Sequence, residues 1–144
     1  SVTFYKIPGH DTVIVHAGIP GNMKSFPQNI DESQMSGNQR KKLGLDRLQR
    51  TRYISAKTGS PLHFKDQTPV DPFWADVYDG RFGHIIFGHQ PFMTGVREFP
   101  FATGIDTGAV HGGALTAMII EPSGKRSFAS VPGRLMAEPF QNKI

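Results

Sequence analysis

Two histidines in this 144-residue chain each follow a short apolar run and stand beside a small residue. The β-branched run Thr12–Val15 ends at His16, and the run His84–Phe87 is followed by Gly88 and His89. Both runs are typical of buried strands, and ligands of open α/β sheets bind outside the carboxyl ends of the strands. Two imidazoles delivered there by different strands could bind one divalent metal ion. The alternative is that each histidine is a packed residue with a single hydrogen bond.

Two histidines alone make an incomplete metal site, because a catalytic zinc ion uses three protein ligands and two-metal hydrolases add carboxylates. Asp106 is the carboxylate candidate, although it could instead cap a backbone N–H in a turn. Arg52, beside Tyr53, is the candidate for phosphate binding, because arginine forms planar, bidentate contacts with oxyanions. The alternative for Arg52 is a cation favoured by the dipole at the end of a helix.

Several elements must position these residues. The sequence predicts strands at Val2–Ile7, Thr12–Val15, His84–Phe87, Ala114–Ile120 and Lys125–Val131. The first two strands should form a hairpin, and so should the last two, because a turn sequence separates each pair. The segment from Gly88 to Phe101 is predicted to be a loop, and residues 132–144 an irregular tail.

Two helices are predicted between these strands. The longer one covers Gln39–Tyr53 and is weakened by Gly44, and its apolar face includes Leu45 and Leu48. The shorter one covers Pro72–Tyr78, with Asp71 as the expected N-cap. Strands and helices together favour one α/β domain over residues 1–144.

Composition limits the possible functions. The absence of cysteine excludes disulfides, thiolate catalysis and cysteine-ligated zinc. A formal net charge of +4 favours anionic partners such as phosphate esters, or reflects only a mildly basic surface. No apolar run reaches the roughly 20 residues that span a bilayer, and the first residues do not resemble a signal peptide. We therefore expect no membrane partner and a cytoplasmic location. The missing initial methionine suggests a trimmed or partial chain.

Three motifs, in order, carry a family resemblance: Val15–Pro20, Phe87–Phe92 and Gly104–Ala117. With Pro72–Gly83 they resemble the C-terminal half of a calcineurin-like metallophosphoesterase. The most similar branch is the ApaH-like group, related to symmetrical diadenosine tetraphosphatases and Ser/Thr protein phosphatases. Pro91 stands where other branches of the superfamily have a second histidine, which supports this assignment.

The resemblance implies a fold and a site. The fold would be part of a four-layer α/β/β/α sandwich with a mixed sheet and two divalent metal ions, manganese being favoured over iron, zinc, cobalt or nickel. His16 and His89 match ligands of the second metal, and Arg52 lies where this branch places a phosphate-binding arginine. Asp106 and His111 fall in the loop on the substrate side, where His111 replaces a residue that is usually aromatic.

The implied reaction is hydrolysis of phosphate esters or anhydrides by attack of a metal-activated hydroxide. The substrate would be a dinucleoside polyphosphate, a phosphoprotein, polyphosphate or a capped RNA end; no other nucleic acid is indicated. The family's N-terminal motifs, Asp-x-His, Gly-Asp-x-x-Asp-Arg-Gly and Gly-Asn-His-Glu, do not occur here. We therefore expect this chain alone to be inactive or nearly so, and to need a complementary N-terminal half. The alternative is a degenerate interaction domain that kept the sheet.

Overall fold

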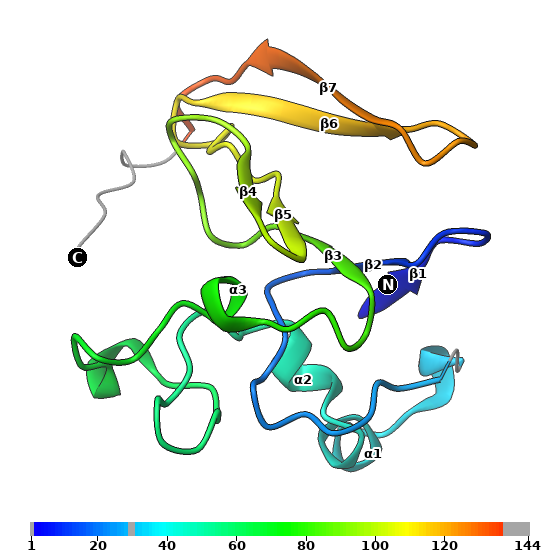
Figure 1. Ribbon diagram of the computed structural model, residues 1–144. Coiled ribbons are helices and arrows are strands. Elements are labelled where there is room, and N and C mark those ends of the chain that lie inside the picture. Colours follow the sequence, from blue (N-terminus) through cyan, green and yellow to red (C-terminus); the bar gives the residue numbers. More distant parts are fainter. Residues whose placement is uncertain (1, 29–30, 137–144) are drawn as a thin grey trace.

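The computed structural model describes residues 2–28 and 31–136, in which a mixed sheet lies between a layer of helices and a β-hairpin (Figure 1). The sheet has the strand order β1-β2-β3-β5-β4. Its strands are β1 (Phe4–Lys6), β2 (Thr12–Val15), β3 (His84–Phe87), β4 (Arg97–Phe99) and β5 (Ala102–Gly104). The α/β class predicted from the sequence is therefore confirmed.

The centre of this sheet is parallel. Strand β2 pairs in parallel with β3, and β3 pairs in parallel with β5, so that Val15, Phe87 and Gly104 lie in one row. The outer strands β1 and β4 run antiparallel to their neighbours. The carboxyl ends of three neighbouring strands therefore meet at one edge, which is where residues that follow each strand come together.

Strands β2 and β3 have the predicted bounds, whereas β4 and β5 differ from the prediction. The segment Gly88–Phe101 is not all loop, because it contains β4. Strand β5 consists of Ala102, Thr103 and Gly104, and all three are buried. Small and polar residues of this kind give no apolar periodicity, and they form a strand here because β3 and β4 supply its hydrogen bonds.

The predicted helix Gln39–Tyr53 is wrong in its extent. It is two short helices, α1 (Gly37–Lys42) and α2 (Leu45–Leu48), separated by Gly44 in the left-handed conformation with a φ of 72°. Glycine tolerates that conformation and ends a helix there. Leu45 and Leu48 are fully buried, as their spacing predicts, whereas Arg52 and Tyr53 lie beyond the helix.

The other helical segments are short. A single turn of 3₁₀ helix spans Glu32–Gln34 and another spans Phe64–Asp66. Helix α3 covers Trp74–Val77, so that Pro72 and Asp71 both precede it. Asp71 is not its N-cap: one carboxylate oxygen accepts from the backbone N–H of Ala56 at 2.9 Å. No helix in the described ranges is long and apolar enough to cross a membrane.

The core lies between the sheet and the helices, which Figure 1 shows on one side of the sheet. Val15 of β2 and Phe87 of β3 are neighbours on that face, and Leu48 and Trp74 belong to the same hydrophobic cluster. The other face carries Ile14, which is 39% exposed although it belongs to a central strand. The helical face is therefore closed, whereas the opposite face is only partly open, because Ile86 and Thr103, which lie in one row with Ile14, are buried.

The hairpin lies over part of that open face. It consists of β6 (Ala114–Ile120) and β7 (Arg126–Pro132), which pair antiparallel along their whole length, as predicted. One anchor to the sheet is a hydrogen bond from Arg126 Nη2 to Thr12 Oγ1 at 3.1 Å. Leu135 forms an isolated bridge beyond β7, and residues 137–144, the rest of the predicted tail, lie outside the described residues.

Candidate functional site

His16 and His89 lie in contact, as expected for residues that follow neighbouring parallel strands. His16 Nε2 and His89 Nδ1 are 3.1 Å apart and share a hydrogen bond. The backbones are joined as well, because Gly88 N–H donates to His16 O at 3.0 Å. The two rings therefore converge at the carboxyl edge of the sheet, where the sequence predicted a metal site.

The backbone of His89 adopts an uncommon conformation. Its φ is 66°, which is the left-handed region, and no other non-glycine residue in the described ranges has a positive φ. Strained backbone of this kind persists where the surroundings fix it, and it is concentrated at functional sites. One fixing contact is the hydrogen bond from Arg52 Nη2 to His89 O at 2.8 Å.

The surroundings of His89 favour its neutral form. Burial lowers the pKa of its imidazole, and the charges of Arg52 and His16 lower it further, while Asp106 opposes them. A neutral imidazole is the form that binds a metal ion. His89 therefore keeps a metal-binding form below the pH at which an ordinary histidine becomes a cation.

Arg52 lies beside the histidine pair and has a hydrogen-bond donor without a partner among the described residues. Its Nη2 holds the carbonyl of His89, whereas its Nε is buried and, among the described residues, has no hydrogen-bond partner. Burial lowers the pKa of the guanidinium, and the negative charge of Asp106 opposes that effect. Helix α2 ends at Leu48, so the helix-dipole explanation for Arg52 fails. A half-buried guanidinium with an unsatisfied N–H is suited to an oxyanion.

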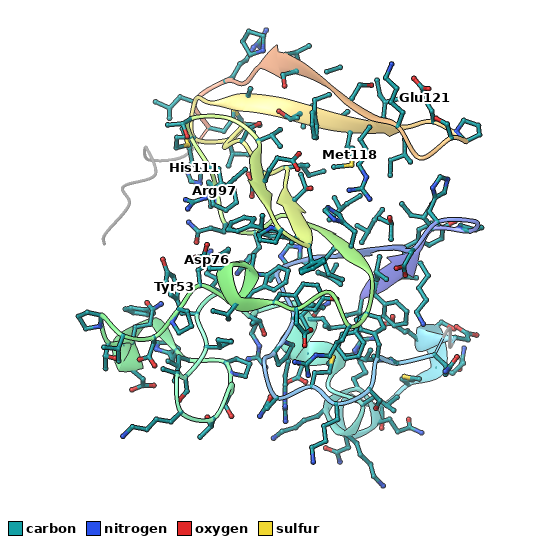
Figure 2. All side chains as sticks on the ribbon, in the orientation of Figure 1. Tyr53, Asp76, Arg97, His111, Met118 and Glu121 are labelled. Carbon is teal, nitrogen blue, oxygen red and sulfur yellow. The ribbon has the colours of Figure 1, made fainter. Side chains whose placement is uncertain are left out.

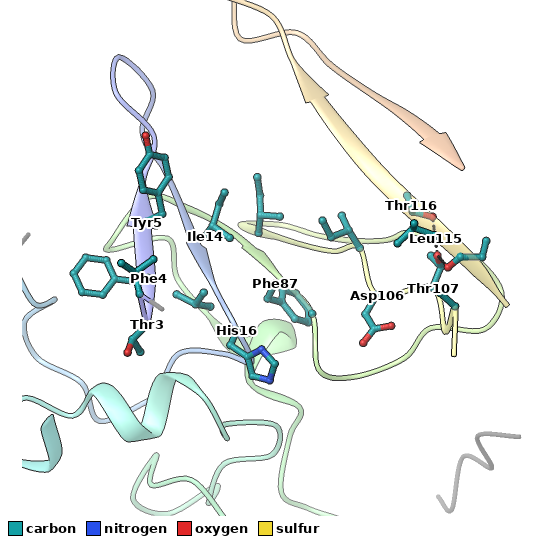
Figure 3. Close-up of a pocket in the computed structure, with 17 residues that line it drawn as sticks. Thr3, Phe4, Tyr5, Ile14, His16, Phe87, Asp106, Thr107, Leu115 and Thr116 are labelled. Atoms are coloured by element: carbon teal, nitrogen blue, oxygen red, sulfur yellow. Dashed lines mark hydrogen bonds between the residues drawn. The ribbon is translucent and has the colours of Figure 1, made fainter. Parts of the chain in front are cut away.

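Asp106 faces the same region from the loop after β5. Figure 3 shows His16 and Asp106 on either side of Phe87. Asp106 Oδ1 accepts a hydrogen bond from the N–H of Gly108 at 3.1 Å, so Asp106 has the turn-capping role considered from the sequence. The backbone is fixed too, because Phe92 N–H donates to Asp106 O at 2.8 Å. Asp106 thus contributes a negative charge near Arg52 and closes its own turn.

His111 lies in the turn that leads into β6. Its backbone N–H donates to Gly108 O at 2.9 Å, and it pairs with Leu135 in an isolated bridge. Figure 2 shows His111 at the hairpin side of the molecule, whereas Tyr53, the neighbour of Arg52, lies near α3. The substrate-binding role suggested for His111 stays a prediction.

A pocket of about 500 Å³ separates the open face of the sheet from the hairpin. Its walls are mostly apolar, and its exposed large hydrophobic side chains are Val2, Tyr5, Ile14 and Leu115. His16 and Asp106 lie among the lining residues (Figure 3). The pocket therefore connects the uncovered sheet face with the candidate site.

The histidine pair fits part of a metal centre. Two imidazole nitrogens that bind one tetrahedral ion lie roughly 3.4 Å apart, close to the spacing found here. Within residues 2–28 and 31–136, however, no three His, Cys, Asp or Glu side chains are grouped so that they could hold an ion. The described residues can therefore supply two ligands of one ion, and they lack the carboxylates that a two-metal site requires.

A comparison with curated proteins bears on this site. The chain is 30% identical over 142 residues to the asymmetrical bis(5'-nucleosyl)-tetraphosphatase PrpE of Halalkalibacterium halodurans. The resemblance to ApaH-like metallophosphoesterases is confirmed. The aligned region is 96% of this chain but 48% of the relative, so the chain spans about half the length of the tetraphosphatase it matches. No protein-family model matches the chain.

The relative also refines the resemblance. Its name specifies asymmetrical cleavage, whereas the motifs alone had suggested kinship with the symmetrical enzymes. The match extends over nearly the whole chain and so goes beyond the region that the motifs cover. A share of 48% is consistent with a C-terminal half of an ApaH-like phosphoesterase.

Proposed function

We propose that this chain forms the C-terminal half of a metal-dependent phosphoesterase that hydrolyses dinucleoside polyphosphates. The observation that carries the proposal is the 3.1 Å contact between His16 Nε2 and His89 Nδ1, with Arg52 bonded to the carbonyl of His89. Two imidazole nitrogens and a guanidinium thus lie together at the strand ends. The name of the relative supports the substrate class.

The residues divide the work between them. His16 and His89 would hold one divalent ion, with manganese favoured from the family resemblance. When bound, such an ion supplies Lewis-acid activation of water and neutralises phosphate charge. Arg52 would bind and orient a phosphate oxygen through its guanidinium. The negative charge of Asp106, close to Arg52, would hold the guanidinium in position when no substrate is bound.

We further propose that a second polypeptide segment, equivalent to the rest of the relative, covers the open sheet face. This segment would complete a four-layer α/β/β/α sandwich and bring the carboxylates that the described residues lack. The open apolar pocket supports the idea, because exposed apolar surface of this kind usually marks an interaction site. His16 and Asp106 line the pocket, so a segment bound there would lie beside the proposed metal site.

The test is titration of the 144-residue chain with Mn²⁺ and Zn²⁺ by calorimetry, combined with assays on p-nitrophenyl phosphate and diadenosine tetraphosphate. We expect one weakly bound ion and no turnover. His16→Ala and His89→Ala should each abolish that binding, whereas His63→Ala, an exposed histidine that caps the 3₁₀ turn at Phe64–Asp66, should preserve it.

Three outcomes are informative. Binding that survives both histidine substitutions would refute the proposed metal site. Two bound ions with turnover would mean that the missing ligands come from elsewhere in the chain or from a second copy. Absence of binding in the unaltered chain would favour the alternative of a degenerate interaction domain, which the lack of a carboxylate cluster in the described ranges also supports.

A further inference from the structure

Trp74 contacts all three parts of the proposed site, although it reaches none of the proposed ligand atoms. It is the one tryptophan of the sequence and the first residue of α3, and it is 1% exposed. We propose that Trp74 is the positioning residue that sets the arrangement of His16, His89 and Arg52. The inference rests on the proposed function, because that function defines which residues make up the site.

The first contact is with the loop that carries His16. Gly18 follows His16 by two residues, and a Cβ placed on Gly18 would lie 2.3 Å from Trp74 Nε1. That separation is far below any normal contact, so only glycine lets the loop lie against the indole. The loop is also tied to α2, because Ala17 N–H donates to Leu48 O at 2.9 Å. The loop that carries His16 therefore packs directly against the indole of Trp74.

The second contact is with the strand that leads to His89. The rings of Trp74 and Phe87 meet edge to face, with centroids 4.9 Å apart. Phe87 is 1% exposed and is the last residue of β3, two residues before His89. An aromatic pair in this geometry fixes both rings beyond what burial alone achieves.

The third contact is with the segment that carries Arg52. The backbone N–H of Trp74 donates to Arg52 O at 2.9 Å. The adjacent residues extend this pairing, because Tyr53 and Phe73 form an antiparallel bridge. One residue thus fixes the position of the guanidinium-bearing segment through its backbone and the two histidine loops through its side chain.

One feature of the indole supports a role beyond filling space. In the part of the chain that the structure describes, its Nε1 is buried without a hydrogen-bond partner. A buried tryptophan normally pairs this N–H, and leaving it unpaired is unfavourable. A phenylalanine would fill much of the same space and would leave no unpaired N–H. Burial alone therefore does not account for a tryptophan here, and the property that only tryptophan supplies is the shape of the indole against Gly18 and Phe87.

The test compares Trp74→Phe with Tyr78→Phe in the full 144-residue chain. Tyr78 directly follows α3, its ring lies tilted against that of Trp74 with centroids 5.7 Å apart, and its hydroxyl donates to Gly83 O at 2.9 Å. The control therefore loses stability in the same region without touching the site. We expect Trp74→Phe to weaken Zn²⁺ binding, measured by calorimetry, about 10-fold, as loss of a residue that orients ligands does. Tyr78→Phe should bind Zn²⁺ with unchanged affinity.

Hydrogen exchange supplies a readout that needs no metal. The amide of Ala17 donates to Leu48 O and that of Gly88 to His16 O, so both report on the two histidine loops, whereas the amide of Ile85 in β3 donates to Phe101 O. We expect Trp74→Phe to speed exchange of Ala17 and Gly88, relative to Ile85, about 10-fold more than Tyr78→Phe does. Equal ratios in the two variants would overturn the proposal, whether or not the chain binds Zn²⁺ or hydrolyses phosphoesters.

A double substitution adds a second, independent criterion. Gly18→Ala places a methyl group against the indole, so it should loosen the amides of Ala17 and Gly88 and weaken Zn²⁺ binding. Adding Trp74→Phe removes Nε1, the nearest of the three indole atoms that the methyl group would meet, so the double variant should recover part of the protection lost in Gly18→Ala. Strictly additive losses would show that Gly18 and Trp74 act separately and would contradict the inference.

Discussion

His84 should make the stability of this protein depend on pH in the mildly acidic range. The residue begins β3 on the face covered by the hairpin, and its Nε2 shares a 2.8 Å hydrogen bond with the fully buried Thr103. Burial lowers the pKa of its imidazole from 6.5 to about 4, and the charge of Arg126 contributes to that change. The folded protein therefore resists protonation of His84.

The sign follows from proton binding. Between pH 6.5 and about 4 the unfolded chain binds a proton at His84 and the folded chain does not, so stability falls as pH falls. For one such group, lowering the pH from 7.5 to 5 would reduce the free energy of unfolding by about 2 kcal/mol. Because the ring is partly accessible to water, we expect about 1–2 kcal/mol.

The assay is urea unfolding of the unaltered chain and of His84→Gln at pH 7.5, 6.5, 5.5 and 5. Glutamine can keep a hydrogen bond to Thr103 but does not titrate, so subtracting the two curves removes the effect of all other groups. The unaltered chain should lose about 1–2 kcal/mol relative to the variant over this range. Arg126→Gln should reduce this loss of stability, because the charge of Arg126 is one of the two causes of the lowered pKa of His84. A difference that stays constant with pH, or an NMR titration of His84 centred at 6.5, would refute the reasoning.

Two further predictions concern the helical layer. Glu32→Gln should lower the free energy of unfolding in urea at pH 7 by about 2 kcal/mol, because the side chain of Glu32 is 4% exposed and pairs with Arg40 at 2.8 Å. A decrease below about 0.5 kcal/mol, as for a neutral surface change, would contradict this. Gly44→Ala should cost about 1 kcal/mol because Gly44 has a φ of 72°. Gly37→Ala, in open space within α1, should be neutral or slightly stabilising by the same measurement, and equal effects of the two substitutions would argue against a conformational origin.

The central strands and the histidine pair could be predicted because local sequence determines them. Thr12–Val15 and His84–Phe87 are apolar runs flanked by turn residues, and the structure gives both strands these bounds. Their parallel pairing then brings the residues that follow them together. The convergence of His16 and His89 is therefore a consequence of two short segments and one rule of topology.

Other features could not be predicted because distant residues determine them. The β5 residues Ala102–Gly104 have no strand-like pattern, and they form a strand only between β3 and β4. The place of Arg52 also depends on tertiary structure, because α2 ends at Leu48 and a backbone contact with Trp74 fixes the segment that follows. No pattern in the sequence indicates that Gly18 lies against the indole of Trp74, because the two residues are far apart in the chain.

The left-handed backbone of His89 has a consequence for engineering. Asparagine or glycine adopts a φ of 66° more readily than histidine does, so either would relieve strain at this position. Selection for thermal tolerance alone would thus favour replacing a residue that the proposed chemistry needs. Libraries screened only for stability would drift toward sequences that keep the sheet and lose the metal ligand. His89 should therefore be held constant in any consensus or stability redesign of this protein.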